Sequence, residues 1–323
     1  MERFCEPWTV VLAAGEGSRL RSLTTDSEGK SIPKQFCSLN GGPSLLQLAL
    51  RRASRISPWS QITTIVAEQH EAWWHGELGS VRFGNVVVQP ANRGTAIGVL
   101  LPVLRILARD PAAHVVLLPS DHFFTDEPVL ERALRGALRE VERRPGRLVL
   151  LGIVPDEPDT EFGWILPANN DKLGIRRVER FVEKPPADVA VELMAKGGVW
   201  NSFVLAAAGQ TIVSLFEEKL PGVITRLQEA LARDSDLCST TETLSRTYEE
   251  LGSYDFCRDV LEGLEDRLSV LPVPHCGWSD LGTPDRVARC VDRIADTPRP
   301  FAGVEARLDL ALASLAMQAS PTA

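Results

Sequence analysis

Short apolar runs rich in β-branched residues alternate with longer helical stretches over the first 155 residues, and this alternation constrains the fold more than any other feature. The runs are Val10 to Ala13, Ile62 to Ala67, Val86 to Val88, Val115 to Leu118 and Leu148 to Val154. Strands that alternate with helices indicate a parallel sheet covered by helices on both faces. The sequence therefore predicts an α/β fold with a doubly wound, mostly parallel sheet.

Helical periodicity fills most of the spaces between these runs. Apolar residues at helical spacing predict helices over Leu45 to Ile56, Thr95 to Ala108, Pro128 to Arg143 and Pro284 to Ile294. Between about Asp156 and Phe203 the chain changes to short strand-like pieces, which predict an inserted, mixed sheet region. One late strand is expected at Leu268 to Pro272.

The C-terminal end differs from the rest of the chain. Thr297 to Phe301 holds two prolines and is the best candidate linker. Beyond it, Val304 to Met317 has one apolar helical face, which could pack on its own domain or on a second subunit in a homodimer. We expect one domain over residues 1–296, a linker and helical tail over 297–323, and no β-helix domain, because no repeat of that kind is found.

Composition excludes several classes of function. The chain of 323 residues is 44% hydrophobic and carries a net charge of −8, which argues against bulk binding of nucleic acid. No apolar run reaches the length of a membrane span and no signal peptide is indicated, so no membrane partner is expected. The six cysteines show no close pairing, which favours a reduced, cytoplasmic setting. A zinc site at His275 and Cys276 would lack a second close ligand pair.

A glycine loop follows the first apolar run and brings positive charge with it. The loop spans Gly15 to Gly17, with Arg19 just after it and Lys34 further along. Backbone can approach a phosphate closely where no Cβ intervenes, and successive N–H groups form an anion-binding concavity. Leu20 occupies the third glycine position of a dinucleotide-binding loop, and the Gly-Lys-Ser/Thr end of a Walker loop is missing. The loop therefore predicts a triphosphate site, with an ordinary strand-to-helix turn as the alternative.

Two aspartates follow strand-like runs. Asp121 comes after Val115 to Pro119, and Asp280 follows the late strand through Gly277-Trp278-Ser279. In open α/β sheets, ligands bind beyond the carboxyl ends of the strands. Two carboxylates from separate strands, beside a triphosphate, suit Mg²⁺, which bridges protein carboxylates to phosphate oxygens. Each aspartate alone could instead cap a helix or form a turn.

Two further polar segments follow strands. Gln89 to Thr95 offers amide, hydroxyl and backbone groups that could read the edge of a nucleobase or cap the following helix. In Phe181 to Pro185, strand alternation places Glu183 and Lys184 on opposite sides unless the strand bends at Pro185. This second segment could also be a solvated edge strand.

Taken in order, eight segments resemble the motif set of the sugar-1-phosphate nucleotidyltransferases: LAAGEGSRL, IPKQF, QPANRGTA, PSDHFF, EFGW, FVEKP, WNSF and GWSDLG. The resemblance covers roughly residues 8 to 290, and the ordered set is far more specific than any one member. Pro33-Lys34-Gln35-Phe36, followed by Ser44-Leu45-Leu46-Gln47, is most similar to the mannose-1-phosphate guanylyltransferase branch. The resemblance implies a Rossmann-like, GT-A-like nucleotide-diphospho-sugar transferase fold with an inserted sugar-binding sheet region. It also implies transfer of a nucleotidyl group from GTP to mannose 1-phosphate, with Mg²⁺ as cofactor and pyrophosphate as leaving group.

The resemblance further implies a role for each matching residue. Arg19 would hold the triphosphate with the help of Lys34, and Lys184 would bind the sugar 1-phosphate. Asp121 and Asp280 would ligate Mg²⁺. The sugar hydroxyls would contact Gly163, Glu183 and Asn201, and the nucleotide would contact Ala13, Ala14, Gly15, Gly17, Gln89, Asn92, Gly94 and Thr95. Because both substrates are anions, such a reaction depends on positioning and charge neutralisation rather than on a strong base.

Some positions depart from the pattern of many relatives. Ala14 stands where many of them have a second glycine, and Arg21-Ser22-Leu23 replaces a pair that often contains tryptophan and proline. These departures bear on the choice of base and sugar more than on the chemistry. The alternatives are another NDP-sugar pyrophosphorylase, a catalytically silent regulatory paralogue that binds nucleotide sugars and, opposed by Leu20, an NAD-dependent oxidoreductase.

Overall fold

A central sheet organises the part of the chain that the structure describes. The structure is a computed structural model, and it describes residues 6–25, 29, 31–78, 85–168, 174–233 and 241–296. The predicted linker and tail helix after residue 296 therefore lie outside the described residues. Within these ranges the strands are β1 (Trp8–Ala13), β2 (Ile62–Ala67), β3 (Val86–Gln89), β4 (His114–Pro119), β5 (Leu148–Ile153), β6 (Trp164–Pro167), β7 (Arg176–Val182), β8 (Val199–Ala208) and β9 (Leu268–Val273).

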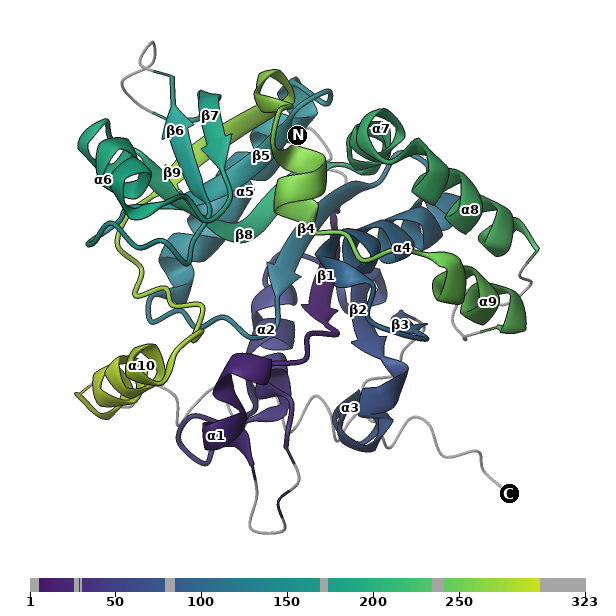
Figure 1. Cartoon of the computed structure of the whole chain (residues 1–323), viewed down its shortest axis with the longest axis horizontal. Coiled ribbons are helices and arrows are strands. Elements are labelled where there is room, and N and C mark those ends of the chain that lie inside the picture. Colours follow the sequence, from purple (N-terminus) through teal and green to yellow (C-terminus); the bar gives the residue numbers. More distant parts are fainter. Residues whose placement is uncertain are drawn as a thin grey trace.

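The strands form one mixed sheet in the order β3-β2-β1-β4-β8-β5-β9-β7-β6 (Figure 1). β1 runs parallel to β2 and β4, β2 runs parallel to β3, and β5 runs parallel to β9. β8 lies antiparallel between β4 and β5. The α/β class is confirmed, and the inserted strands extend the same sheet because β8 pairs with strands on both sides. The parallel strands β1, β2 and β4 end at one edge (Figure 1), where the candidate residues were expected.

Helices cover both faces of this sheet. They are α1 (Arg21–Thr24), α2 (Leu45–Ala53), α3 (Glu71–Leu78), α4 (Gly94–Arg109), α5 (Glu127–Arg143), α6 (Ala187–Ala195), α7 (Gly209–Lys219), α8 (Pro221–Ala232), α9 (Glu242–Glu250) and α10 (Pro284–Asp296). The predicted helices at α2, α4, α5 and α10 are confirmed, with ends that differ by up to three residues. Local sequence explains two of the starts. Ser44 and Gln47 form a reciprocal capping box on α2, and Asp126 caps α5 through the Val129 N–H.

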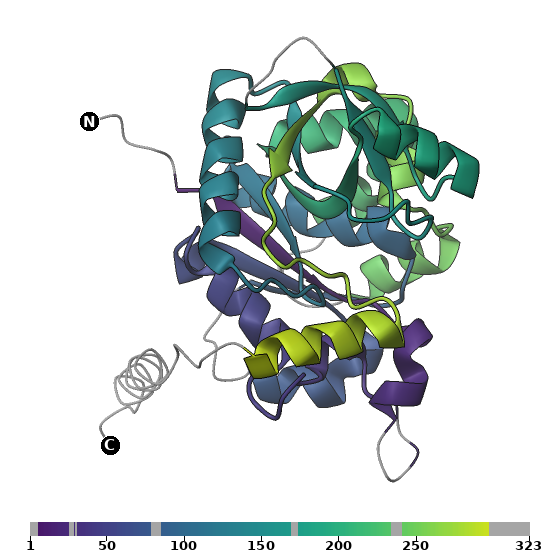
Figure 2. The same ribbon diagram turned by 90° about the vertical axis from the view of Figure 1, so that its left-hand side faces the viewer.

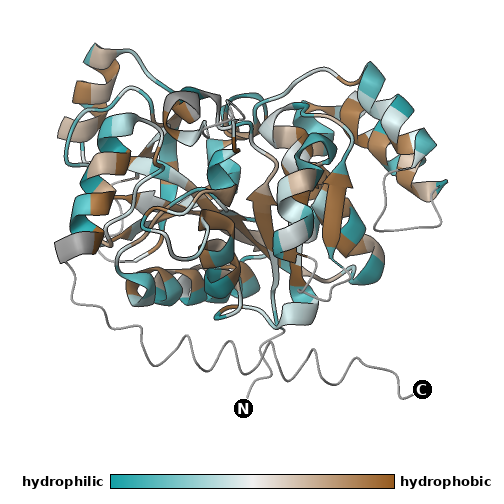
Figure 3. Ribbon diagram, turned by 90° about the horizontal axis from the view of Figure 1, so that it is seen from below, coloured by the Kyte–Doolittle hydropathy of each residue, from teal (hydrophilic) through white to brown (hydrophobic). Residues whose placement is uncertain are grey.

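The core lies in two layers, one on each face of the sheet. α4, α7, α8 and α9 pack their apolar sides on one face, and α2, α5 and α6 pack on the other. Figure 3 shows the strands in brown between helices whose outer sides are teal. A smaller cluster of Leu45, Leu281 and Cys290 joins α10 to the start of α2, and it anchors the segment that carries Asp280. α10 is the yellow helix in Figure 2.

The structure bears on two of the sequence predictions, one about membrane-spanning segments and one about the cysteines. No helix there has both the length and the apolar character needed to cross a membrane. Cys37, Cys257, Cys276 and Cys290 are free thiols.

Candidate active site

The glycine loop rests on the segment that carries Lys34. Gly17 has a φ of 60°, and a Cβ there would lie 3.0 Å from the backbone nitrogen of Lys34. The Gln35 side chain donates hydrogen bonds to the carbonyl oxygens of Ala13 and Gly15, each at 3.0 Å. These bonds fix the loop between Ala13 and Gly15 in one shape. No role for Gln35 was predicted from the sequence, although it lies within the IPKQF motif.

Lys34 is buried and joins the two segments that carry the candidate metal ligands. Its Nζ lies 2.7 Å from Asp121 Oδ2 and donates to the Asp280 carbonyl oxygen at 2.5 Å. Burial by itself raises the pKa of Asp121, but the positive charge of Lys34 and the neighbouring His122 outweigh it and lower that pKa below its usual value. Asp121 is therefore a carboxylate at neutral pH. The sequence predicted Lys34 as a cation for phosphate, and the structure pairs it with Asp121.

Asp280 reaches the same place through a short antiparallel bridge. Phe123 and Ser279 exchange backbone hydrogen bonds of 2.9 and 3.0 Å, which set the segments after β4 and β9 side by side. Asp280 Oδ1 accepts from the Gly282 N–H at 2.9 Å and from Arg286 Nη1 at 2.8 Å. Arg286 is buried on α10, and no motif in the sequence pointed to it as a partner of Asp280.

Arginines connect the glycine loop and Asp280 to the loop before Gly163. Arg19 Nη1 donates to Glu161 Oε2 at 3.1 Å, and Arg19 Nη2 lies 4.0 Å from Asp280 Oδ2. Arg286 also pairs with Asp159, and its guanidinium lies over the Phe162 ring at 4.2 Å from the centroid. The glycine loop, the metal-candidate segment and the loop between β5 and β6 therefore meet in one network of charges.

The donor set at this edge suits Mg²⁺ better than zinc. Asp121 and Asp280 supply hard carboxylate oxygens from two adjacent segments, and Mg²⁺ commonly takes one or two carboxylates and completes its shell with water and phosphate. In the described part of the chain, no group of three or more His, Cys, Asp or Glu side chains could enclose a metal. The two carboxylates would supply only part of the coordination shell of a metal ion.

The segment predicted to contact the base forms a tight turn before α4. Gln89 is buried at the end of β3, and its Oε1 has no hydrogen-bond partner among the described residues. Asn92 Oδ1 accepts from the Gly94 N–H at 2.9 Å, as turn residues commonly do. The Thr95 hydroxyl accepts from the Phe256 N–H at 2.8 Å and donates to Asp255 at 3.2 Å. Thr95 thus ties α4 to residues 254–256, which no sequence motif indicated.

Gly94 should tolerate no side chain. It has a φ of 81°, and a Cβ would lie 2.2 Å from the Tyr254 carbonyl oxygen. We expect Gly94→Ala to lower the free energy of unfolding by about 2–3 kcal/mol, because the left-handed backbone and the clash add. Urea unfolding measures the change, and Gly98→Ala is the matched control because no atom lies within 4 Å of its Cβ position in the same helix. Equal effects of the two substitutions would contradict this account.

The three residues assigned to the sugar are neighbours. The Asn201 N–H donates to the Gly163 carbonyl oxygen at 2.7 Å. A Cβ on Gly163 would lie 2.5 Å from Glu183 Oε2 and 3.4 Å from Asn201 Cβ, so glycine is what allows the three to approach. Asn201 Nδ2 also contacts the Cys257 sulfur at 3.2 Å. β6, β7 and β8 thereby bring together residues that lie far apart in the sequence.

Lys184 turns the chain at the end of β7. Its φ of 47° is a left-handed conformation, and its side chain is exposed. Such a backbone ends the strict alternation of a strand, so Glu183 and Lys184 need not face opposite sides of the sheet. The bend that the sequence placed at Pro185 begins one residue earlier.

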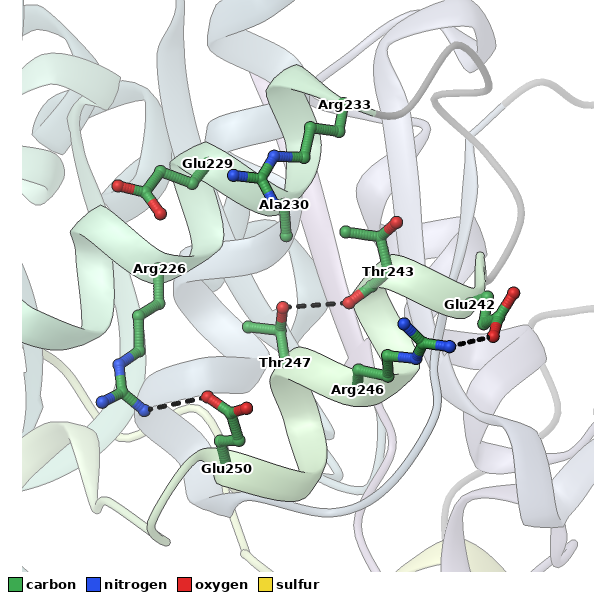
Figure 4. Close-up of a pocket in the computed structure, with 9 residues that line it drawn as sticks. All are labelled: Arg226, Glu229, Ala230, Arg233, Glu242, Thr243, Arg246, Thr247 and Glu250. Carbon is green, nitrogen blue, oxygen red and sulfur yellow. Dashed lines mark hydrogen bonds and ion pairs between the residues drawn. The ribbon is translucent and has the colours of Figure 1, made fainter.

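A hollow of 340 Å³ lies elsewhere, between α8 and α9 (Figure 4). Four of its charged residues form two ion pairs: Arg226 lies 3.5 Å from Glu250, and Arg246 lies 2.5 Å from Glu242. Its lining contains none of the site residues that were predicted from the sequence. The chemistry is therefore better placed at the strand ends than in this hollow.

The chain is similar to known proteins over most of its length. Residues 8–296 match the family described as "Nucleotidyl transferase". A mannose-1-phosphate guanylyltransferase of Escherichia coli (strain K12) is 32% identical over 290 residues, which are 85% of this chain and 58% of that protein. The alginate biosynthesis protein AlgA of Pseudomonas fluorescens is 29% identical over 278 residues, which are 84% of this chain and 56% of that protein. The chain thus spans little more than half the length of these relatives.

Solved structures give the same result for the fold. A crystal structure described as a mannose-1-phosphate geranyltransferase from Thermus thermophilus matches with a TM-score of 0.75 at 28% identity, covering 91% of this chain and 80% of that one. A putative glucose-1-phosphate thymidylyltransferase from Bacillus anthracis matches with a TM-score of 0.57 at 19% identity, covering 90% of this chain and 96% of that one, which speaks for the fold alone.

Proposed function

The chain belongs to the nucleotidyl transferase family, and we propose that it transfers a guanylyl group from GTP to mannose 1-phosphate, giving GDP-mannose and pyrophosphate. One observation carries the proposal furthest. Arg19, just after the glycine loop, pairs with Glu161, two positions before Gly163, so the segment suited to a triphosphate adjoins the group suited to a sugar. A site for two substrates at one sheet edge is what transfer between them requires.

The reaction would consist of in-line attack by a sugar phosphate oxygen on the α-phosphorus of the nucleotide. Arg19 would hold the triphosphate by paired N–H donors, and Lys184 would hold the sugar phosphate. Lys34 would keep Asp121 ionised and the Asp280 segment in place. Mg²⁺ bound by Asp121 and Asp280 would supply positive charge to the triphosphate. Because the attacking phosphate is already an anion, none of these residues needs to remove a proton from it.

The choice of GTP and mannose 1-phosphate is supported by the relatives and by Gln89. The Escherichia coli relative is named as a mannose-1-phosphate guanylyltransferase. A buried amide oxygen without a partner among the described residues, at the end of β3, suits the N–H donors on the guanine edge, since leaving such an acceptor unpaired is costly. A pyrophosphorylase for another base or sugar is the nearest alternative, and a silent regulatory paralogue is the second.

A pyrophosphate-release assay tests the proposal. Each of five nucleoside triphosphates is crossed with a panel of hexose 1-phosphates in the presence of Mg²⁺. We expect the highest kcat/KM with GTP and mannose 1-phosphate. A different best pair would change the substrate assignment and keep the chemistry, whereas no release with any pair would favour the regulatory paralogue.

A further inference from the structure

Acidic groups gather around Glu183, the middle residue of the sugar group. Its carboxyl lies against the backbone of Gly163, where an added Cβ would be 2.5 Å from Oε2. The Cys257 thiol contacts it, and the carboxylates of Asp255 and Glu262 act on it from the segment after α9. The positive charges that face it, Lys184 and Arg258, are on exposed side chains. Glu183 is therefore half-buried, with other carboxylates close to it and its counter-charges in solvent.

Asp255 is held in position by its own hydrogen bonds. Its Oδ2 accepts from the Thr95 hydroxyl at 3.2 Å, and its Oδ1 accepts from the Arg258 N–H at 2.9 Å. Its backbone N–H donates to Asp259 at 2.6 Å. Because both carboxylate oxygens accept hydrogen bonds, the Asp255 side chain is held in place and does not swing away from Glu183. The negative charge near Glu183 is thus a fixed part of the fold.

These surroundings favour the protonated form of Glu183. Burial acts most strongly and Asp255 next, and together with Glu262 they raise the pKa of Glu183 to about 7, although Lys184 and the Cys257 contact act in the opposite direction. Like charges that cannot both ionise commonly leave one carboxyl neutral. A neutral carboxyl also avoids placing a second negative charge beside a phosphate monoester.

We propose that Glu183 recognises the sugar 1-phosphate as a neutral carboxylic acid that donates its proton in a hydrogen bond to a sugar oxygen, and that Asp255 is the positioning residue that keeps this proton in place. The inference rests on the proposed function. No bond to Glu183 forms or breaks during transfer, and the proton stays on its carboxyl throughout. Glutamine at this position also donates a hydrogen bond, so it should recognise the sugar as the neutral carboxyl does. An ionised carboxylate only accepts hydrogen bonds and should not.

The first experiment measures the KM for mannose 1-phosphate between pH 6 and 8.5. We expect the wild-type KM to rise as pH passes 7. The KM of the Glu183→Gln variant should stay within about threefold of the wild-type value at pH 6.5 and should not show this rise. The ionisation of the substrate itself is common to both proteins and cancels in the comparison. A KM for Glu183→Gln that is more than about tenfold higher at pH 6.5 would overturn the proposal, because it would show that the carboxylate is required.

Asp255→Asn tests the positioning role. Removing its negative charge should move the wild-type rise in KM to lower pH, because Glu183 then ionises more easily. Asp266→Asn is the matched control, since Asp266 is an exposed carboxylate on the neighbouring turn and should leave the curve unchanged. An unmoved curve in Asp255→Asn would remove Asp255 from the proposal.

The protonation state can also be tested without turnover, by urea unfolding at different pH values. In the folded chain Glu183 keeps its proton up to a pKa of about 7, whereas the ordinary value is 4.5. Folded wild type therefore loses stability relative to Glu183→Gln as pH rises from 4.5 towards 7, and the gap stays constant above that. We expect a higher urea midpoint for Glu183→Gln at pH 8 and a smaller gap at pH 5. The same gap at both pH values would overturn the neutral carboxyl, whereas the expected gap in a protein without transferase activity would overturn only the proposed function.

Discussion

The Asp280→Ala variant is expected to turn over at least about a thousandfold more slowly than the wild-type protein at saturating substrates. Asp280 is one of two carboxylates at the meeting point of the glycine loop and the loop before Gly163. Removing it would take away one of the two proposed metal ligands, and of the two ion pairs of Arg286 it would leave the one with Asp159. Both changes weaken the neutralisation of the triphosphate, on which the proposed reaction depends.

The structure also predicts how this loss can be separated from damage to the fold. Asp280 accepts hydrogen bonds from Gly282 and Arg286, so alanine should lower the free energy of unfolding by about 1–3 kcal/mol. Asp280→Asn keeps an acceptor oxygen in the same place and removes the charge. Steady-state pyrophosphate release and thermal unfolding are therefore measured for both variants. A folded Asp280→Ala protein with full turnover would rule out Asp280 as a metal ligand, and full turnover in Asp280→Asn would show that its negative charge is not needed.

The Arg19→Ala variant should lose about a hundredfold in kcat/KM for the nucleotide while its unfolding temperature stays unchanged. The Arg19 side chain is 54% exposed, and it forms an ion pair with Glu161 and approaches Asp280 to 4.0 Å. An exposed ion pair of this kind adds little to stability, so its loss should lower kcat/KM for the nucleotide and leave the stability of the fold unchanged. Stopped-time assays at several GTP concentrations, together with calorimetric titration of GTP, measure the effect.

Glu161→Gln is the matched control for Arg19. It removes the partner carboxylate, which lies 3.1 Å from the guanidinium, and leaves Arg19 itself unchanged. If Arg19 serves the triphosphate, releasing it from Glu161 should keep the affinity for GTP or raise it by up to about fivefold. A loss in Glu161→Gln as large as that in Arg19→Ala would mean that the ion pair, and not contact with the nucleotide, is what matters.

Much of the fold could be predicted because local signals and tertiary structure agree. Apolar β-branched runs became β1, β2, β4 and β5, and the helices at α4 and α5 begin within one residue of the predicted positions. The position of β8 could not be predicted in the same way. Its pairing with β4 and β5 joins residues such as Leu117, Leu150 and Leu205, and no short-range pattern reports which distant strand a strand will pair with.

The residues of the candidate site, too, could be predicted only where a local sequence signal exists. Arg19, Asp121 and Asp280 were found because they follow strands, where ligands of α/β sheets bind. The sugar-binding role of Gly163, Glu183 and Asn201 came only from the family resemblance, since nothing local indicates that they meet. Arg286 gave no signal at all, because its partners Asp280 and Asp159 lie on two other segments of the chain. Side chains that hold other site residues in position are therefore the ones that sequence patterns do not reveal.

The place of β8 has a consequence for how this chain must be made. β4 is complete by Pro119, but its neighbour on one side spans Val199–Ala208, and β5 pairs with β9, which ends only at Val273. Pairings of such long sequence range form slowly, and until they form β4 and β5 present unpaired edges. During synthesis, strands β1 to β5 therefore emerge early, but the unpaired edges of β4 and β5 can pair wrongly with other copies of the chain. Fragments that end before residue 199 should aggregate, and the wild-type chain should depend on chaperones mainly during that interval.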